Sequence, residues 1–197
     1  MLHNTFCRRL AALVLTLAVA VSAVLPVFAV YPMPIQTATE TEAVYLFNAD
    51  TGKTLLTQNA DQPRYVASLT KMMTALLLLE SGKDLNGEVT VPTDLTQEFK
   101  DIQNANGTTM GLRIGETVRR IDLLNALLIT SANDAASVIA WDVGGSLNAF
   151  IQQMNARAAE LGCTSATFTC AHGLYDYGNV ASAEDMAKIA AACAANE

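Results

Sequence analysis

Histidine and cysteine are scarce in this chain of 197 residues, which has two histidines and four cysteines. His172 is the only histidine beyond residue 29, and no Gly-x-Ser-x-Gly sequence occurs, so a Ser-His-Asp triad is not expected. His172 is instead expected to order a loop through hydrogen bonds. Cys-x-x-Cys is also missing, and Cys170 two positions before His172 is poor evidence for zinc. We predict neither a metal nor a cofactor.

Basic residues are few as well, with 12 Lys and Arg against 19 Asp and Glu, which gives a formal net charge of −7. Nucleic acid is therefore not an expected partner. Gly52-Lys53-Thr54 is similar to the end of a phosphate-binding loop, but Phe47 occupies the position of the required first glycine. Nucleotide binding is not predicted.

Acidic residues are missing from residues 1–29, which carry two arginines, an apolar run from 10 to 25, and Ala29. This is the layout of a secretory signal peptide that is cleaved after Ala29. An uncleaved membrane anchor is the alternative, because the run approaches the roughly 20 residues that span a bilayer. Pro26 and Ala29 favour cleavage, which changes the formal charge to −9. The remainder is then extracytoplasmic, either secreted or on the cell-wall side, and membrane association stays open.

Three cysteines remain beyond this segment, namely Cys163, Cys170 and Cys193. An extracytoplasmic compartment permits disulfides. Cys163 and Cys170 flank a short polar stretch and can pair if a turn brings them together, which leaves Cys193 unpaired. The pairing stays open, because the sequence does not establish the required geometry.

About half of the residues are apolar, which suits one domain with a sizeable core. Residues 30–41 are rich in Pro and Thr and predict a linker, so the folded part begins near Glu42. A hairpin is predicted from 43–47 and 54–57. Helices are predicted from Ser68 through 72–79 to Gly82, and at 118–130, 135–143, 147–161 and 183–195, with loops and short pieces at 84–115. Because one hairpin cannot cover the buried helix 72–79, we expect further strands to follow Glu197.

Ser68 and Lys71 place a hydroxyl and an amine three positions apart at a helix start, on one face. A lysine with a pKa of ~10.4 accepts a serine proton only if burial or cationic neighbours disfavour its charged form. The apolar run after Lys71 favours such burial. Ser-x-x-Lys also arises by chance, and Ser68 can equally be a helix cap with Lys71 in solvent.

A second polar sequence, Ser-Ala-Asn at 131–133, joins two apolar helices where a cleft can form. The Ser131 hydroxyl can relay a proton between Lys71 and a leaving amine, and the Asn133 amide can bind a peptide backbone. A helix junction that both residues merely cap is the alternative. Ser146 begins a sequence of the same spacing, but it follows two glycines and is expected to cap the next helix.

The order Ser-x-x-Lys and then Ser-x-Asn about 60 residues later resembles penicillin-binding proteins and related β-lactamases. Several segments narrow the resemblance, over residues 43–191, to the low-molecular-mass D-alanyl-D-alanine carboxypeptidases. These segments are 67–74, 131–136, 154–158, 161–162, 172–174 and 182–187. One departure is Cys170, which stands where an asparagine is usual.

The resemblance implies an α+β fold of the β-lactamase/DD-peptidase kind, with an antiparallel sheet packed on helices and a helical subdomain. Only the N-terminal hairpin of that sheet is expected within this sequence. The resemblance also implies a nucleophile at Ser68, a base at Lys71, a proton-relaying hydroxyl at Ser131 and a substrate-binding amide at Asn133. The implied substrate is a peptidoglycan stem peptide ending in D-Ala-D-Ala, and β-lactams should acylate the same serine.

The Lys-Thr-Gly motif of that family does not occur, because the only Lys-Thr pair, Lys53-Thr54, precedes Leu55 and lies upstream of Ser68. We interpret residues 42–197 as the N-terminal portion of a catalytic domain. Very weak or no turnover is expected, since the missing strand would bind the substrate carboxylate and supply an oxyanion donor. A β-lactamase-like hydrolase stays open, although nothing marks a deacylating glutamate, and so does a non-catalytic wall-binding fragment.

Overall fold

The computed structural model describes residues 41–174 and 176–196. The predicted signal peptide (1–29) and all of the predicted linker except Thr41 lie outside the described residues. Within the described part, no helix has both the length and the apolar character needed to cross a membrane.

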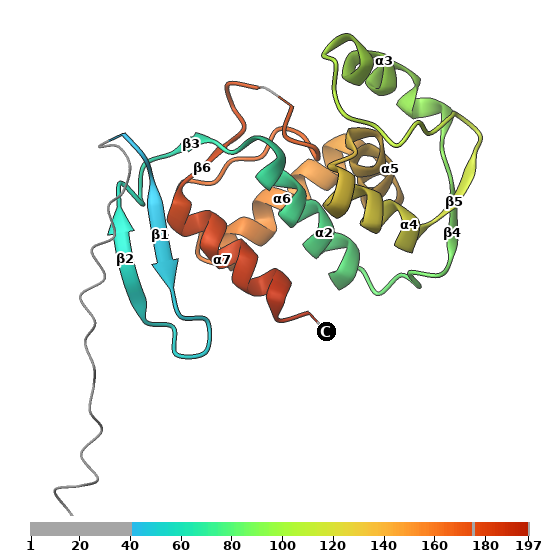
Figure 1. Ribbon diagram of the computed structural model, residues 1–197. Helices are drawn as coiled ribbons and strands as arrows, with labels where there is room; N and C mark the ends of the chain where they lie inside the picture. Colours follow the sequence, from blue (N-terminus) through green and yellow to red (C-terminus); the bar gives the residue numbers. More distant parts are fainter. Residues whose placement is uncertain (1–40, 175, 197) are drawn as a thin grey trace, which may run out of the picture. The chain divides into compact units, whose positions relative to one another are not determined.

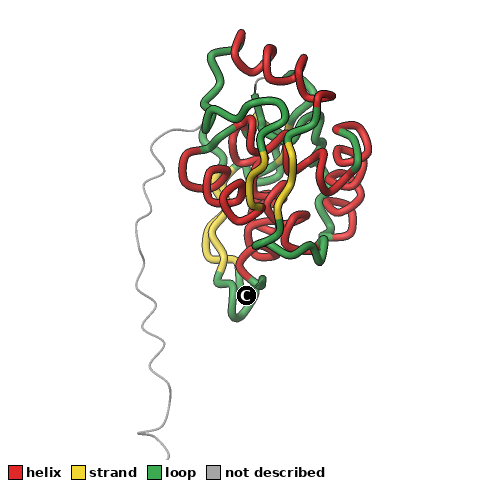
Figure 2. The backbone as a smooth tube through the Cα atoms, turned by 90° about the vertical axis from the view of Figure 1, so that its right-hand side faces the viewer, coloured by secondary structure: helices red, strands yellow, loops and turns green. Residues whose placement is uncertain are grey.

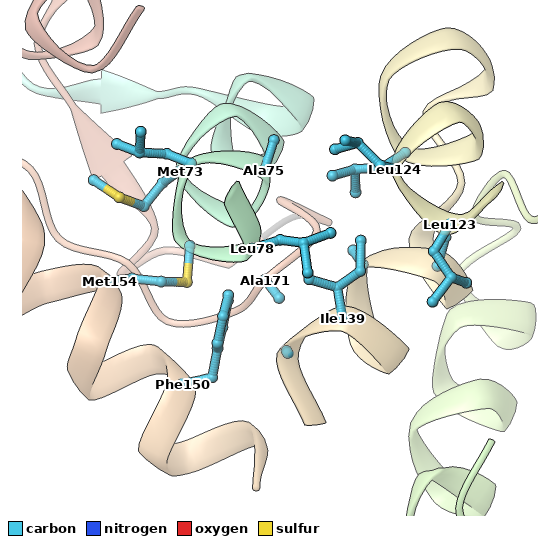
Figure 3. Packing of buried hydrophobic residues seen from close by; sticks show 14 of the residues in the cluster. Met73, Ala75, Leu78, Leu123, Leu124, Ile139, Phe150, Met154 and Ala171 are labelled. Atoms are coloured by element: carbon cyan, nitrogen blue, oxygen red, sulfur yellow. The ribbon is translucent and has the colours of Figure 1, made fainter. Parts of the chain in front are cut away.

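Helix α2 (Thr70–Glu80) lies in the middle of the helical part, which is why its sequence is apolar on nearly every side (Figure 1). It packs against three longer helices, which are α5 (Asn133–Gly144), α6 (Leu147–Glu160) and α7 (Ala183–Ala194). Met73 and Leu78 of α2 join Ile139, Phe150 and Met154 in one buried apolar cluster (Figure 3). The predicted burial of this helix is confirmed.

The strands form three separate antiparallel pairs, β1–β2, β3–β6 and β4–β5. Their bounds are β1 (Val44–Phe47), β2 (Thr54–Gln58), β3 (Arg64–Tyr65), β4 (Glu88–Thr90), β5 (Thr117–Arg119) and β6 (Val180–Ala181). The predicted hairpin is β1–β2, with Leu46 opposite Leu56. The other two pairs were not predicted, because strands of two or three residues give almost no alternation. The β4–β5 pair crosses one face of the helical part (Figure 2).

Two predicted segments differ from the structure. The expected helix 118–130 begins two residues later, with α4 (Arg120–Asn125), because Val118 pairs with Val89 in the β4–β5 ladder. Its last five residues form a π-helical turn, η3 (Ala126–Thr130). The segment 84–115 contains the short turn η2 (Thr93–Leu95) and a nine-residue helix, α3 (Thr96–Asn104). Helix α3 buries only Ile102 and is otherwise mostly polar, so its sequence was interpreted as part of a loop.

All three cysteines of the described residues are free. The possible pairing of Cys163 with Cys170 is therefore not present in the structure. The Cys163 thiol instead donates to the carbonyl of Asp185, and the Cys170 sulfur lies near the backbone of Gly173.

Candidate active site

Ser68 sits in a short 3-10 turn, η1 (Ala67–Leu69), that leads directly into α2. Neither η1 nor α2 has a side-chain cap, so the interpretation of Ser68 as a simple helix cap is wrong. Lys71, one turn later, is only 3% exposed, which also excludes a solvated lysine. The hydroxyl of an exposed serine and the amine of a buried lysine are thus held 3.2 Å apart at the beginning of the central helix.

Two residues next to Ser68 have a strained backbone conformation. Among the described non-glycine residues, four have a positive φ, and two of them are Asn59 and Asn106, which tolerate it. The other two are Ala67, with φ 46°, and Ser131, with φ 59°. Such conformations cost about 1–2 kcal/mol in a residue with a Cβ and persist where the surrounding structure holds them. Ala67 directly precedes Ser68, and Ser131 contacts it.

The Lys71 amine has three oxygen atoms within hydrogen-bonding distance. Its Nζ lies 2.8 Å from Asn133 Oδ1, 2.6 Å from the His172 carbonyl oxygen and 3.2 Å from Ser68 Oγ. Two of these atoms are carbonyl oxygens, which only accept. A neutral amine has two N–H groups and one lone pair, so both N–H groups are occupied and the lone pair faces the Ser68 hydroxyl. The arrangement can therefore move a proton from Ser68 to Lys71.

The protonation of Lys71 depends on its surroundings. Burial lowers the pKa of this amine from 10.5 to about 8, and Cys170 opposes the shift weakly. The neutral form is therefore far more populated near neutral pH than for an ordinary lysine, although the protonated form still predominates. The desolvation expected from the apolar sequence after Lys71 is present, since most of α2 is buried.

Ser131 reaches Ser68 from the end of the π-helical turn η3. Its hydroxyl donates to Ser68 Oγ at 3.0 Å. The N–H groups of Ser131 and Ala132 both donate to the carbonyl of Ala126, which ends the helix and holds Ser131 in its left-handed conformation. The chain reverses at this point, and the side chain of Ser131 projects toward the start of α2.

Asn133 is oriented by the loop between α3 and β5. Its Nδ2 donates to the Thr108 carbonyl at 2.9 Å, and its backbone N–H donates to the same oxygen at 2.8 Å. The amide oxygen must therefore face Lys71. Helix α5 has Ala132 as its N-cap and no side-chain cap, so neither Ser131 nor Asn133 caps α5 with its side chain. Ser131 does end η3 through its backbone, but its hydroxyl is directed at Ser68.

Asp134 fixes that loop against α5. Its carboxylate accepts the backbone N–H groups of Met110, Gly111 and Leu112, each at 3.0 Å. Asp134 is 2% exposed, so these bonds are shielded from water. The carboxylate thereby holds the segment whose Thr108 carbonyl orients Asn133.

His172 holds Lys71 with its backbone while its side chain faces away toward α3. Nε2 lies 3.0 Å from Glu98 Oε1, and Nδ1 accepts the Leu174 N–H at 3.0 Å. The predicted role of His172 in ordering a loop is confirmed. Next to it, a Cβ on Gly173, whose φ is +79°, would collide with the Ala67 carbonyl oxygen, so only glycine allows this loop to approach η1.

The ring of His172 is subject to opposing influences. Burial lowers its pKa, but hydrogen bonds with Cys170 and Glu98 raise the pKa to about 9. The Leu174 bond nevertheless requires Nδ1 without a proton, because a backbone N–H can only donate. That bond therefore belongs to the neutral ring, with its proton on Nε2, whereas a pKa of about 9 favours the doubly protonated ring at neutral pH. Protonation of the ring costs the Leu174 bond.

The structure therefore brings together all four residues singled out in the sequence, Ser68, Lys71, Ser131 and Asn133. The carbonyls of Thr108 and His172 were missed, because a backbone acceptor has no signature in the sequence. Asp134 was missed too, although an acidic residue directly after the Ser-Ala-Asn sequence could have pointed to it.

The fold places the chain in the class of the DD-peptidases. It is similar to the crystal structure of the Streptomyces K15 DD-transpeptidase, with a TM-score of 0.70 and 31% identity over 76% of this chain and 58% of that one. It is also similar to the D-alanyl-D-alanine carboxypeptidase DacD from Francisella tularensis, with a TM-score of 0.66 and 27% identity over 74% of this chain and 35% of that one. The predicted fold class is confirmed.

Residues 31–196 match the profile of the D-alanyl-D-alanine carboxypeptidase family, and the chain belongs to this family. The D-alanyl-D-alanine carboxypeptidase DacF of Bacillus subtilis is 33% identical over 78% of this chain. A D-alanyl-D-alanine endopeptidase of Pseudomonas aeruginosa is 32% identical over 89% of it. The chain spans 39% and 54% of the lengths of these two relatives.

Proposed function

We propose that this chain carries the acyl-transfer site of a serine D-Ala-D-Ala carboxypeptidase, with Ser68 as nucleophile and Lys71 as base. The observation that carries the proposal is the orientation of Lys71. Two carbonyl oxygens accept from Lys71 Nζ, and Ser68 Oγ is the third atom in reach, so the neutral form of the amine has its lone pair directed at Ser68 Oγ. An amine whose pKa is lowered to about 8 and that points at a serine hydroxyl has the properties of a general base.

In the proposed reaction, Lys71 takes the Ser68 proton while Ser68 Oγ attacks the penultimate carbonyl carbon of a stem peptide ending in D-Ala-D-Ala. The tetrahedral intermediate collapses, the peptide bond breaks, and the leaving D-Ala amine receives a proton through the Ser131 hydroxyl, 3.0 Å from Ser68 Oγ. Water then hydrolyses the acyl-enzyme ester. Asn133 Nδ2 has a second N–H beyond the one given to Thr108, and it can bind the substrate backbone.

The family and this chemistry support a role in peptidoglycan metabolism on the extracytoplasmic side of the cell membrane. The proposed partners are stem peptides and, as covalent inhibitors, β-lactams that acylate Ser68. Residues 42–197 are proposed to form the N-terminal portion of the catalytic domain, and membrane association of the native protein is left to experiment.

Turnover by this chain alone is expected to be very weak, since no Lys-Thr-Gly follows Ser131 in the sequence. Acylation is a more sensitive readout than turnover, because it requires only one attack by Ser68. The test is intact-mass measurement of the purified chain after exposure to a labelled penicillin. We expect one covalent adduct, which peptide mapping places on Ser68.

The matched variants are Ser68→Ala, Lys71→Met and Ser146→Ala. The first two should abolish the adduct, whereas Ser146→Ala should keep it, because Ser146 only caps α6 through the Ala149 N–H. An adduct that survives Ser68→Ala, or no adduct on a chain that unfolds cooperatively, would contradict the proposal. A comparison of penicillin hydrolysis with D-Ala release separates a β-lactamase-like hydrolase from a carboxypeptidase.

A further inference from the structure

Glu98 binds two residues that lie beside the Lys71 site. It belongs to the first turn of α3, and its side chain is 23% exposed. One oxygen of its carboxylate, Oε1, lies 3.0 Å from His172 Nε2 and 2.9 Å from Ser137 Oγ. A single carboxylate therefore joins three parts of the chain, namely α3, α5 and the segment that contains His172.

The two elements that Glu98 binds carry the two carbonyl groups that accept from Lys71. His172 supplies its main-chain oxygen, 2.6 Å from Lys71 Nζ, and Asn133 of α5 supplies Oδ1 at 2.8 Å. Ser137 follows Asn133 by one helical turn, and its hydroxyl also lies 3.3 Å from the Asn133 carbonyl oxygen. Both acceptors of the amine thus belong to segments that one carboxylate holds together.

The bond between Glu98 and His172 has the same direction in both protonation states of the ring. A neutral ring that accepts the Leu174 N–H at Nδ1 carries its proton on Nε2, and a doubly protonated ring carries one there as well. Nε2 therefore donates to Glu98 Oε1. This hydrogen bond is the main reason that the pKa of Glu98 is lowered, although burial opposes the shift, so the carboxylate is ionised at neutral pH.

The backbone of the His172 segment is held from α2. The Thr74 hydroxyl donates to the Ala171 carbonyl at 2.6 Å, and Lys71 donates to the next carbonyl along the chain. These two hydrogen bonds tie the segment to α2 and not to α5, which carries the other acceptor of Lys71. Glu98 supplies that link, because its second partner belongs to α5.

The influence of Glu98 on Lys71 is one of position rather than charge. Burial is the main influence on the pKa of Lys71 and Cys170 adds an opposing one, whereas Glu98 contributes to neither. A neutral side chain of the same shape should therefore replace Glu98, because it still offers an acceptor oxygen. A side chain without an acceptor should not.

We propose that Glu98 is a positioning residue for the base Lys71, because it fixes the His172 carbonyl relative to α5 and so directs the amine at Ser68. This inference rests on the proposed function of Ser68 and Lys71. Without the carboxylate, the His172 ring loses its partner at Nε2, and its segment can shift relative to α5. A shift of less than an ångström at a reacting group is enough to slow the reaction about tenfold.

The test is the acylation rate at saturating penicillin, measured per folded molecule with the full chain. Glu98→Ala should lower this limiting rate about tenfold and leave the penicillin concentration of half-maximal rate unchanged, because only the attack by Ser68 needs the oriented amine. Glu98→Gln should stay within about twofold of the original rate. Asp101→Ala is the matched control, since this carboxylate also lies on α3 and lines the same cavity, but its side chain binds Gln97. It should leave both constants unchanged.

Two further comparisons separate this role from a general loss of stability. Helix α3 buries only Ile102, so Glu98→Ala should leave the chain folded. His172→Ala removes the ring and keeps the backbone carbonyl, so adding Glu98→Ala to it should cause no further slowing. Additive losses would contradict a route through the ring. A Glu98→Ala chain that loses stability but keeps its limiting rate would overturn the positioning role, and so would equal slowing by Glu98→Ala and Glu98→Gln.

The His172 ring gives a readout that does not depend on penicillin. His3 and His172 are the two histidines of the chain, so His3→Ala leaves one imidazole for NMR spectroscopy of an isotope-labelled sample. Its Nε2–H should be protected from exchange with water in the original chain and in Glu98→Gln, and exposed to exchange in Glu98→Ala. Equal protection in all three overturns the proposed link. Loss of protection in Glu98→Ala, on a chain that penicillin never acylates, supports the link while contradicting the proposed function, so the two failures are distinguishable.

Discussion

Helices α5 and α7 begin with the same device and use it for different purposes. Each has a buried aspartate in its first turn that binds the backbone of a distant loop, Asp134 for residues 110–112 and Asp185 for residues 164 and 165. Helix α7 also has a serine cap, Ser182, whose hydroxyl accepts the Asp185 N–H. Helix α5 has no side-chain cap.

The missing side-chain cap at the start of α5 is explained by another role of its polar residues. The residues on either side of its N-cap, Ser131 and Asn133, direct their side chains to Ser68 and Lys71. Helix α7 has a side-chain cap and α5 has none, because the polar side chains near the start of α5 bind residues at the start of α2 instead. Neither Ser182 nor Asp185 bonds directly to Ser68 or Lys71, so we expect the start of α7 to act mainly on stability, whereas the start of α5 also determines the geometry around the nucleophile.

The largest effect is expected from Asp134→Ala. Loss of the carboxylate leaves the Met110, Gly111 and Leu112 N–H groups without their acceptor and releases the Thr108 carbonyl that orients Asn133. The free energy of unfolding should fall by about 3 kcal/mol, and acylation by penicillin should slow about 100-fold, as for an ångström-scale displacement of reacting groups. Denaturant unfolding and intact-mass kinetics measure the two quantities. A stability loss with an unchanged acylation rate would contradict the assigned link to the site.

Asp185→Ala should give the same loss of stability without the kinetic effect. Its carboxylate accepts two N–H groups and the Ser165 hydroxyl and is 1% exposed, so its removal should lower the free energy of unfolding by about 3 kcal/mol. Acylation per folded molecule should stay within about twofold of the unmodified chain, since small changes in side-chain positions cost little. A large kinetic loss in this variant would remove the distinction between the two helix starts.

The two regions should also respond to pH in different ranges. Acylation should rise with pH and level off above about 8, because Lys71 must lose its proton before it can accept the one from Ser68. Burial raises the pKa of Asp185, but hydrogen bonds from Ser165 and Thr164 lower it overall. Its contribution to stability is therefore complete above its unfolded pKa of ~3.9 and is lost as pH falls through the lower folded value. The acylation rate and the free energy of unfolding, each measured as a function of pH, test these two predictions. An acylation rate independent of pH between 6 and 9 would exclude Lys71 as the base.

The smallest effect is expected from Ser182→Ala, which removes only the cap of α7. The free energy of unfolding should decrease by about 1 kcal/mol with no change in acylation. Thermal unfolding monitored by circular dichroism measures it, with Ser146→Ala at the start of α6 as the matched capping variant. A Ser182→Ala chain that loses acylation would show that α7 also determines the site.

The sequence predicted the central helix from its apolar run, and it predicted the four polar residues from the Ser-x-x-Lys and Ser-x-Asn sequences together with their resemblance to a known family. It did not predict β3–β6, β4–β5 or α3, since their short or polar sequences are stabilised by partners far along the chain. The carbonyls of Thr108 and His172 could not be predicted for a related reason, because tertiary structure alone brings these backbone oxygens to Asn133 and Lys71. The environment of Lys71 was predicted, whereas the direction of its lone pair required the structure.

The π-helical turn η3 places a constraint on chain length. A π-turn contains more residues per turn than an α-helix, and one residue added to or removed from a helix rotates all later residues of that helix by about 100°. Leu128 and Ile129 within it are 56% and 79% exposed, so exchange of these side chains should be tolerated. Deletion or insertion of a single residue between Arg120 and Ser131 would instead turn the Ser131 hydroxyl away from Ser68. At Leu128 and Ile129, the number of residues therefore matters more than their type.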